Sequence, residues 1–426
     1  MDINMDISII VPIYNQELHL EKCLTSLLNI KDLCVEIICI NDGSDDRSFE
    51  IMEEYQRKDS RIKIINKENT GYGDSMNRGI TSAEGKYIFF IESDDWLADY
   101  ALNDLFDNAE KFSADIVKGN YYIYNSGQDK VSIYENLKNF QYNCLVQKEN
   151  RDKLFFVAPS IWSALYRKDF LIQNNIFFLP TQGAAYQDTS FAFKVWAKAE
   201  KIVLIQTPII FYRQDNAESS SNQRNKIFNI CDEFKEINRF IKENKLQNLA
   251  PILARVKYIS YMWNVNRLAQ YDKIKFLMVI RKEFRKESYD GNLVKKYWGD
   301  ADWERIHNVI FNFEEYCKKI VGEQVNNEQT LLLELLHYVT PIYIYGAGQY
   351  GRKVLKYLME RKIGIDGFIV TNLDKNPLCV NGVPVIDAKR ASYDGLIIIG
   401  VSAKYKNEVI NELEKKRYNN FIELSL

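Results

Sequence analysis

Long apolar runs are missing from this sequence of 426 residues, although 46% of its residues are hydrophobic. A membrane-spanning helix needs about 20 consecutive apolar residues, and no run in the sequence reaches that length. The opening segment 1–6 is acidic and the apolar run behind it has the length of a strand, so we expect no signal peptide. The sequence therefore favours a cytoplasmic protein without a transmembrane segment.

A surplus of positive charge and clustered metal-binding side chains are also missing. The formal net charge is −2, so the basic footprint of a nucleic-acid-binding protein is absent. The seven cysteines show no CxxC spacing, and Cys23, Cys34 and Cys39 fall within apolar patterns, as reduced core residues do. The three histidines are scattered along the chain. These absences argue against a nucleic-acid partner, a disulfide framework and a zinc site.

The clearest positive signal is a short apolar run that ends in carboxylates. Ile88–Ile91 is followed at once by Glu92, Ser93, Asp94 and Asp95. A run this short is typical of a buried strand in a parallel sheet, and open α/β sheets bind ligands at the carboxyl ends of such strands. Carboxylate and phosphate oxygens are the ligands that Mg²⁺ and Mn²⁺ prefer. A solvated acidic turn is the alternative interpretation.

Two upstream strands strengthen the first interpretation. The apolar segments Ile7–Ile13 and Val35–Ile40 flank a segment with helical periodicity between residues 18 and 28. Strand, helix and strand at this spacing predict a right-handed βαβ unit. The second strand runs into Asn41 and Asp42, so its carboxyl end should face the same crevice as Asp94 and Asp95.

Four motifs in one order now resemble a known family, the inverting GT-A glycosyltransferases of family 2. They are Ser8–Asn15, Asn41–Asp46, Asn69–Gly79 and Glu92–Asp95, and they cover roughly the first half of the chain. The resemblance implies an α/β GT-A (Rossmann-like) domain that binds a nucleotide-sugar, with UDP as the favoured nucleotide. Two positions depart from the family pattern: Glu92 stands where Asp is usual, and Met76 where many members have Arg.

The resemblance also implies roles for individual residues. It assigns the donor to Pro12, Tyr14, Asp42, Asn69, Gly71, Asn77 and Asp94. It assigns the cofactor, Mn²⁺ or Mg²⁺, to Asp94 and Asp95. Sugar transfer passes through an oxocarbenium-like transition state, as glycoside hydrolysis does, and a bound cation would stabilise the charge on the departing diphosphate.

The acceptor hydroxyl needs a base, for which the family often has Glu-Asp before a helix. This chain has Gln187 and Asp188 there, so the resemblance implies Asp188 as the catalytic base and places Gln187 on the acceptor side. The alternative role for Asp188 is that of a helix N-cap.

Trp162 and Arg213 complete the acceptor side that the resemblance implies. Trp162 could stack on a sugar ring or pack as a buried aromatic. Arg213 could bind phosphate or carboxylate through its planar fork, or form an ion pair with Asp215.

The remaining half of the chain divides near residue 338. Apolar residues at helical spacing predict a helical segment over 222–337, which could pack on the first domain, shape the acceptor cleft or form a homo-oligomer interface. The basic run Arg281–Lys286 could contact an anionic membrane surface or form a solvated helix face. Peripheral contact with the inner membrane face is therefore an alternative to a purely cytoplasmic location.

A glycine-rich turn follows the strand Pro341–Tyr345. Gly346, Gly348 and Gly351 form a GxGxxG pattern before a helix and a second strand, the context in which this pattern binds nucleotides. That second strand, Gly367–Val370, lacks the acidic residue that grips a ribose. The region resembles the N-terminal Rossmann-like domains of nucleotide-sugar acyltransferases, which implies a small doubly wound domain for nucleotide binding or assembly.

The sequence thus predicts three domains: 1–221, a GT-A catalytic domain; 222–337, helical; and 338–426, Rossmann-like. The predicted function is metal-dependent inverting transfer of a hexose or N-acetylhexosamine from a UDP-sugar to a glycan acceptor, lipid-linked or protein-linked, in cell-surface polysaccharide or glycoprotein assembly. The alternatives are a sugar nucleotidyltransferase, whose glycine-rich phosphate loop is missing after the first strand, and a non-catalytic nucleotide-binding scaffold.

Overall fold

The computed structural model describes residues 5–126, 130–215, 227–321, 341–361, 363–388, 395–415, 418 and 421–423. The chain divides into two compact units, Met1–Ile252 and Leu253–Leu426, and each is described by itself. Both predicted domain boundaries, after residues 221 and 337, fall outside the described ranges. The division into three domains therefore stays a prediction.

The first unit is built on one mixed sheet with the strand order β3-β2-β1-β4-β8-β6-β9-β5, and β7 pairs with β6. Its strands are β1 (Ile7–Ile13), β2 (Val35–Asp42), β3 (Ile62–Lys67), β4 (Tyr87–Phe90), β5 (Trp96–Leu97), β6 (Ile116–Asn125), β7 (Lys130–Tyr134), β8 (Ala164–Arg167) and β9 (Ile202–Arg213). The pairs among β1, β2, β3 and β4 are all parallel. The predicted βαβ unit is confirmed.

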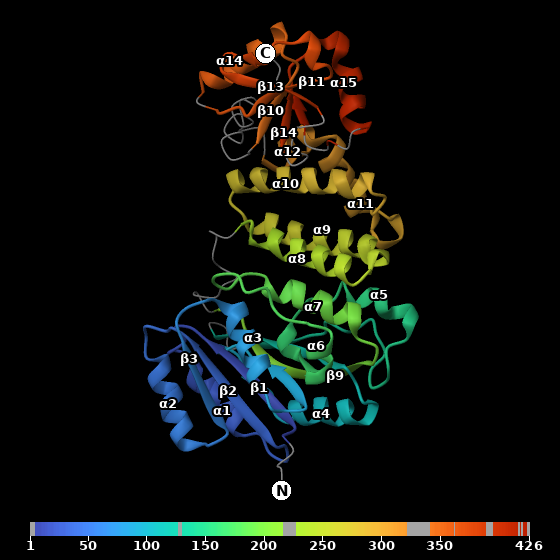
Figure 1. Cartoon of the computed structure of the whole chain (residues 1–426). Helices are drawn as coiled ribbons and strands as arrows, with labels where there is room; N and C mark the ends of the chain where they lie inside the picture. The colour runs from blue at the N-terminus through green and yellow to red at the C-terminus, as the bar shows by residue number, and fades with distance from the viewer. Residues whose placement is uncertain are drawn as a thin grey trace. The chain divides into compact units, whose positions relative to one another are not determined.

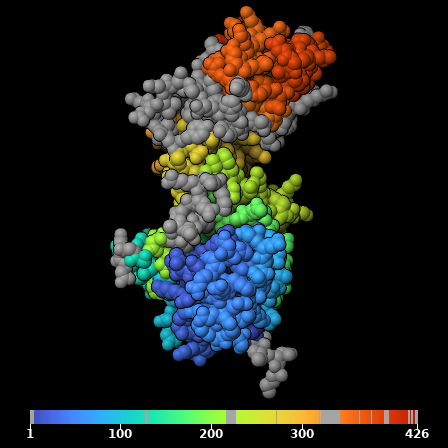
Figure 2. Space-filling model, turned by 90° about the vertical axis from the view of Figure 1, so that its left-hand side faces the viewer, coloured from blue at the N-terminus to red at the C-terminus, as the bar shows by residue number. Residues whose placement is uncertain are grey.

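Helices cover both faces of this sheet (Figure 1). One face packs against α1 (Leu20–Leu28), α2 (Ser48–Lys58) and α4 (Ala101–Phe112); the other carries α3 (Tyr72–Ser82), α6 (Lys168–Gln173) and α7 (Gln187–Lys198), and α5 (Arg151–Leu154) is a single turn. In the space-filling view, the blue atoms of the N-terminal part of the chain form one continuous surface (Figure 2).

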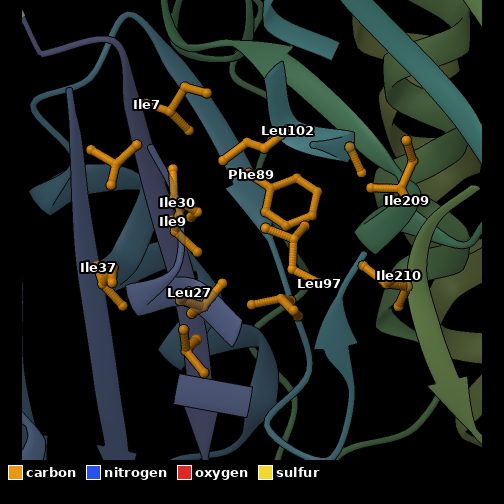
Figure 3. Packing of buried hydrophobic residues seen from close by; sticks show 14 of the residues in the cluster. Ile7, Ile9, Leu27, Ile30, Ile37, Phe89, Leu97, Leu102, Ile209 and Ile210 are labelled. Atoms are coloured by element: carbon orange, nitrogen blue, oxygen red, sulfur yellow. The ribbon is translucent and has the colours of Figure 1, made fainter. Parts of the chain in front are cut away.

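The core on the α1 side is aliphatic. Ile9 of β1 and Phe89 of β4 lie between Leu27 of α1 and Leu102 of α4 (Figure 3), and all four are completely or almost completely buried. Ile10, the next residue along β1, is also completely buried, and its side chain faces Gly79 of α3. Burial of both faces explains why β1 reads as a continuous apolar run.

The predicted helical segment is confirmed over the described residues 227–321. It contains α8 (Asn229–Glu243) in the first unit, α9 (Ala250–Arg267) across the division, and α10 (Gln270–Tyr289), α11 (Asp300–Phe311) and α12 (Phe313–Val321) in the second. In the second unit Lys257 is almost completely buried and pairs with Glu283 (3.2 Å) and Glu287 (2.6 Å) of α10. Within the described part of the chain, no helix combines the length and apolar character needed to cross a membrane.

The C-terminal sheet has the strand order β12-β13-β11-β10-β14-β15. Its elements are β10 (Ile342–Tyr345), α14 (Gln349–Met359), β11 (Gly367–Val370), β12 (Cys379–Val380), β13 (Val383–Asp387), β14 (Leu396–Ile399), α15 (Ala403–Lys415) and β15 (Phe421–Glu423). Helix α14 packs in one apolar cluster and α15 in the other, on alternate side chains of the same strands. The predicted doubly wound sheet is confirmed, although β13 escaped the sequence analysis because Pro384 lies within it.

A buried carboxylate on β2 ties three segments of the first unit together. Glu36 accepts hydrogen bonds from Ser8 Oγ (2.5 Å) and the Glu84 amide (2.6 Å), and Lys63 Nζ lies 2.7 Å from its other oxygen. Burial alone would raise the pKa of Glu36, but these donors outweigh it and lower the pKa. The ionised form is therefore the one that stabilises the fold.

We expect Glu36→Gln to lower the free energy of unfolding by about 1–3 kcal/mol at pH 7, because it removes hydrogen bonds to a charged group. Since the pKa of Glu36 is lowered on folding, its contribution is complete above the unfolded value of 4.5 and is lost as pH falls through the folded value. Denaturant unfolding at pH 7 and pH 3 measures this. The exposed Glu53→Gln on α2 is the control, and an equal loss in the two variants would contradict the prediction.

Candidate active site

The parallel strands bring the predicted acidic residues to one edge of the sheet. The β1–β2 register places Ile13 beside Asn41, and the β1–β4 register places Ile10 beside Phe90. Asp42, the last residue of β2, and Asp95, which follows β4, therefore lie at the common carboxyl edge of the sheet. The predicted convergence of the strand ends is confirmed.

Asp95 is the most deeply buried carboxylate at this edge, with 1% of its surface exposed. Its Oδ1 accepts the backbone N–H of Arg213 at 2.8 Å, whereas its Oδ2 is buried without a hydrogen-bond partner. Burial, followed by the charge of Asp94, raises its pKa well above the usual range. An uncompensated buried carboxylate oxygen calls for a cation or a proton.

Asp94 and Asp95 fit a hard divalent cation. Mg²⁺ and Mn²⁺ commonly take one or two carboxylates and complete their coordination with water and substrate phosphate. Within the described ranges, no group of three or more His, Cys, Asp or Glu side chains could hold a metal ion. The donor set suits a cation that arrives with an anionic ligand better than a cation held by protein alone.

Arg213 lies at this acidic edge as well. Its Nε donates to the backbone oxygen of Asp94 (3.1 Å), its guanidinium lies over the ring of Trp96, and Asp215 is 3.7 Å away. The alternative ion pair with Asp215 is therefore present, but the side chain is only 9% exposed. Although the sequence analysis placed Arg213 on the acceptor side, these contacts are with the carboxylate cluster that is expected to bind the donor.

Glu92 turns toward the neighbouring helix. The hydroxyl of Tyr72, the first residue of α3, donates to Glu92 Oε1 at 2.6 Å. Burial, with added repulsion from Asp94 and Asp188, raises the pKa of Glu92 to about 8. The longer side chain at this position thus links the β4 edge to α3.

Asp188 lies in the first turn of α7 but does not cap it. The N-cap residue is Tyr186, which has a φ of 66°, and the helix begins at Gln187; the alternative N-cap role for Asp188 is therefore wrong. Burial raises the pKa of Asp188, while hydrogen bonds from Thr189 and the charge of Lys118 lower it. Because Asp188 also raises the pKa of Glu92, the two carboxyls belong to one electrostatic neighbourhood.

The side chain of Gln187 holds the loop before α7 together through a set of hydrogen bonds, called here the Gln187 clasp. It is 2% exposed, accepts from the Ala185 amide (2.6 Å), and donates to Thr181 Oγ1 (3.0 Å) and to the Gly183 carbonyl (3.1 Å). An amide is needed because one end accepts while the other donates. These contacts are all within the loop, and the acceptor-side role of Gln187 stays a prediction.

Asp42 organises the loop that follows β3. It accepts hydrogen bonds from the amides of Thr70 (2.9 Å) and Gly71 (3.1 Å) and pairs with Lys67. Gly71 has a φ of +101°, and a Cβ there would lie 2.6 Å from the Thr181 carbonyl oxygen, so only glycine fits. The sequence analysis missed Lys67, although the β2–β3 register places it opposite Asp42.

The other predicted donor residues differ in their surroundings. Asn77 forms a two-way clamp with the backbone of Phe178, donating to its carbonyl (2.9 Å) and accepting from its amide (2.8 Å). Pro12 is buried in β1, whereas Tyr14 is 49% exposed and Asn69 is exposed. Their contact with a donor stays a prediction.

Trp162 packs within the protein. Its ring is half-buried, stacks on the ring of Tyr212 (centroids 5.1 Å apart, planes at 14°) and forms a T-shaped contact with the ring of Tyr121.

His19 is a residue near the candidate site that the sequence analysis missed. Burial and the charge of Arg213 lower the pKa of His19, while the charge of Asp94 raises it. Its position shortly after the end of β1 could have indicated that it lies near the carboxyl edge of the sheet.

The C-terminal glycines form a tight turn before α14. Gly346 has a φ of +101°, and a Cβ on Gly351 would lie 1.8 Å from the Gly346 carbonyl oxygen. Gly348 caps the helix with open space around it. At the end of β11, Thr371 shares a hydrogen bond with the Tyr345 hydroxyl (2.8 Å). Nucleotide binding by this turn stays a prediction.

The first part of this chain is similar in sequence to known proteins. Residues 8–173 match the model of Glycosyl transferase family 2. The putative glycosyltransferase EpsH of Bacillus subtilis is 32% identical over 245 residues, which cover 56% of this chain and 70% of EpsH. Two further relatives are each 31% identical over 49% of this chain: glycosyltransferase GlyA of Streptococcus pneumoniae and the uncharacterized glycosyltransferase EpsJ of B. subtilis. The matched part of this chain spans only 30% of the length of GlyA and 61% of the length of EpsJ.

A solved structure shows the same fold. The structure of Staphylococcus aureus TarS 1–349 in complex with UDP-GlcNAc matches with a TM-score of 0.57 and 19% identity, covering 74% of this chain and 90% of that one. The match shows that the predicted GT-A fold is correct.

We expect Gln187→Glu to lower the free energy of unfolding by about 1–3 kcal/mol, because a carboxylate would face the Gly183 carbonyl where the amide now donates. Thermal and denaturant unfolding measure the change. Gln182→Glu is the matched control, since Gln182 lies in the same loop but is exposed. Equal stability of Gln187→Glu and the wild type would show that the clasp does not form.

Proposed function

This chain belongs to glycosyltransferase family 2, and we propose that it transfers a hexose or N-acetylhexosamine, with inversion, from a UDP-sugar to a hydroxyl of a glycan acceptor. The observation that carries the proposal is the buried Asp95 with its unpartnered oxygen beside Asp94, at the carboxyl edge of the parallel strands. This edge is where open α/β sheets bind ligands.

A divalent cation, Mn²⁺ or Mg²⁺, is the proposed cofactor at Asp94 and Asp95. Held there, it would supply Lewis-acid stabilisation of the leaving diphosphate. Arg213 adds positive charge at the same edge, since its Nε already bonds the Asp94 backbone, and its guanidinium is suited to phosphate oxygens. These residues would hold the diphosphate end of the donor.

Asp188 is the proposed base. Its place in the first turn of α7 favours the ionised carboxylate, because the amino end of a helix carries partial positive charge. A base of this kind accepts the proton of the acceptor hydroxyl as the hydroxyl attacks the sugar, and typically contributes on the order of a hundredfold to ten-thousandfold in rate. Asp188 shares its electrostatic surroundings with Glu92 at the β4 edge, which supports one site for donor and acceptor.

The choice of UDP is supported by the complex of the TarS structure with UDP-GlcNAc. The Asp42-bound turn at Thr70 and Gly71 would line the nucleoside end of the donor. The acceptor proposed is a lipid-linked or protein-linked glycan in surface-polymer or glycoprotein assembly, handled on the cytoplasmic side of the membrane.

We expect Asp95→Ala and Asp188→Ala each to abolish transfer, but only Asp95→Ala to weaken metal-dependent binding of UDP. The first removes a proposed cation ligand, whereas the second removes the base. UDP release from a panel of UDP-sugars, with p-nitrophenyl hexosides as acceptors and with or without Mn²⁺, measures transfer. Calorimetry with UDP and Mn²⁺ measures binding.

Asp99→Ala is the matched control, because Asp99 is exposed just beyond β5; it should retain both activities. Equal loss of UDP affinity in the Asp95 and Asp188 variants would refute the division of roles. A wild-type protein that neither binds UDP nor releases it from any donor would refute the proposed function and favour the alternative of a non-catalytic scaffold.

A further inference from the structure

A buried lysine holds the turn that precedes β8. Lys118 of β6 is 1% exposed, and lysine is almost never buried unless its charge is compensated. Its Nζ donates to the carbonyls of Pro159 (3.1 Å) and Ser160 (2.7 Å) and to the hydroxyls of Ser160 (2.8 Å) and Ser163 (2.9 Å). Four oxygen acceptors around three N–H donors favour the charged ammonium.

The oxygens that surround Lys118 belong to the turn that carries Trp162. Ser160 has a φ of 26°, in the left-handed region that side chains other than glycine seldom adopt, so the turn needs an external hold. Tyr166 supplies a second one, since its hydroxyl donates to the Ile161 carbonyl at 3.0 Å. Removing the ammonium would leave the turn without its central donor.

The helix of the proposed base packs close to the same turn: Tyr166, whose hydroxyl bonds the turn, has its ring centroid 5.5 Å from that of Phe191 of α7. The charge of Lys118 lowers the pKa of Asp188, and Asp188 in turn raises that of Lys118, which burial brings down to about 7. The other titratable groups that face Asp188 are acidic carboxyls and phenols on the elements packed around it, namely Glu92, Glu233, Tyr72, Tyr166 and Tyr212. Lys118 therefore supplies positive charge within an acidic environment.

We propose that Lys118 is a positioning residue for sugar transfer, which holds in place the 159–163 turn and, with it, the contact of Tyr166 with α7, the helix of the proposed base. Its charge, which acts on Asp188, is the second part of that role. The inference rests on the proposed function, because it takes Asp188 as the base. Lys118 acts through Asp188 and through the turn of Trp162.

The test is Lys118→Met, which keeps an unbranched side chain, one atom shorter, and removes its charge. Loss of a nearby positive charge raises the pKa of a carboxylate, so the base form requires a higher pH. The acidic limb of the kcat/KM profile, measured with the UDP-sugar and the p-nitrophenyl hexoside that the wild type uses fastest, should move upward by about one pH unit. The KM for the hexoside should rise several-fold, whereas the calorimetric Kd for UDP should stay unchanged.

Ser163→Ala separates the two roles of Lys118. It removes one oxygen from around the ammonium but leaves the charge, so the KM for the hexoside should rise while the acidic limb stays in place. Lys257→Met is the control for loss of any buried lysine, since Lys257 is equally buried in the second unit. This variant should lose stability without a change in the pH profile.

An unmoved acidic limb and an unchanged hexoside KM in Lys118→Met would overturn the inference while the proposed function stands. A wild-type protein that transfers no sugar would end the proposed function, and the inference with it. If Lys118→Met does not fold, Ser163→Ala decides: a raised KM for the hexoside with an unmoved limb supports the inference, and an unchanged KM overturns it.

Discussion

The hydrogen bond from the Arg213 amide to Asp95 joins two residues that are 118 positions apart in the sequence at the candidate site. Asp95 follows β4, in the parallel half of the sheet, whereas Arg213 ends β9, which pairs with β6 and β5. The bond satisfies one carboxylate oxygen and leaves the other buried without a partner. Burial of charge is unfavourable unless it is compensated, so this oxygen requires either a proton or a cation. Arg213 and the nearby Asp94 act on the same requirement, Arg213 by its positive charge and Asp94 by its negative one.

The donor side and the acceptor side of the site depend on one loop. A Cβ on Gly71 or Gly73 would lie within 2.6 Å of backbone oxygens at Thr181 or Leu179, respectively, so the segment before α7 rests directly on the start of α3. Asn77 clamps the same segment through the Phe178 backbone. Asp42 holds the amide of Gly71, and the amide of the next residue, Tyr72, donates to the Gly183 carbonyl (3.1 Å), which also accepts from Gln187 at the start of α7. Hydrogen bonds therefore connect the strand-end carboxylate with the helix of the proposed base.

Strand ends, helix periods and the doubly wound C-terminal sheet could be predicted from the sequence, because each depends on local spacing of apolar residues. The hydrogen-bond partners of Lys67 and Lys118 could not be predicted in this way. Lys118 bonds residues more than 40 positions away, and a lysine in an apolar strand carries no local sign of its acceptors. The N-cap at Tyr186 was missed for a different reason: tyrosine seldom adopts a positive φ, so Asp188 looked like the better cap. The roles of the site residues rest on the family resemblance and on the geometry, not on pattern.

The charge balance around Asp188 explains why a lysine is useful there. Burial raises the pKa of Glu233 of α8 to about 8, and the negative charge of Asp188 contributes to this rise. A carboxyl with this pKa is mostly protonated at neutral pH, so it adds little negative charge beside the base. Its Oε2 accepts the Ser190 amide (3.2 Å) at the start of α7, a bond that does not require ionisation. Below about pH 7, where Lys118 is protonated and Glu233 is neutral, the ammonium of Lys118 and the helix amino end both act on Asp188, and both favour the ionised form that a base needs.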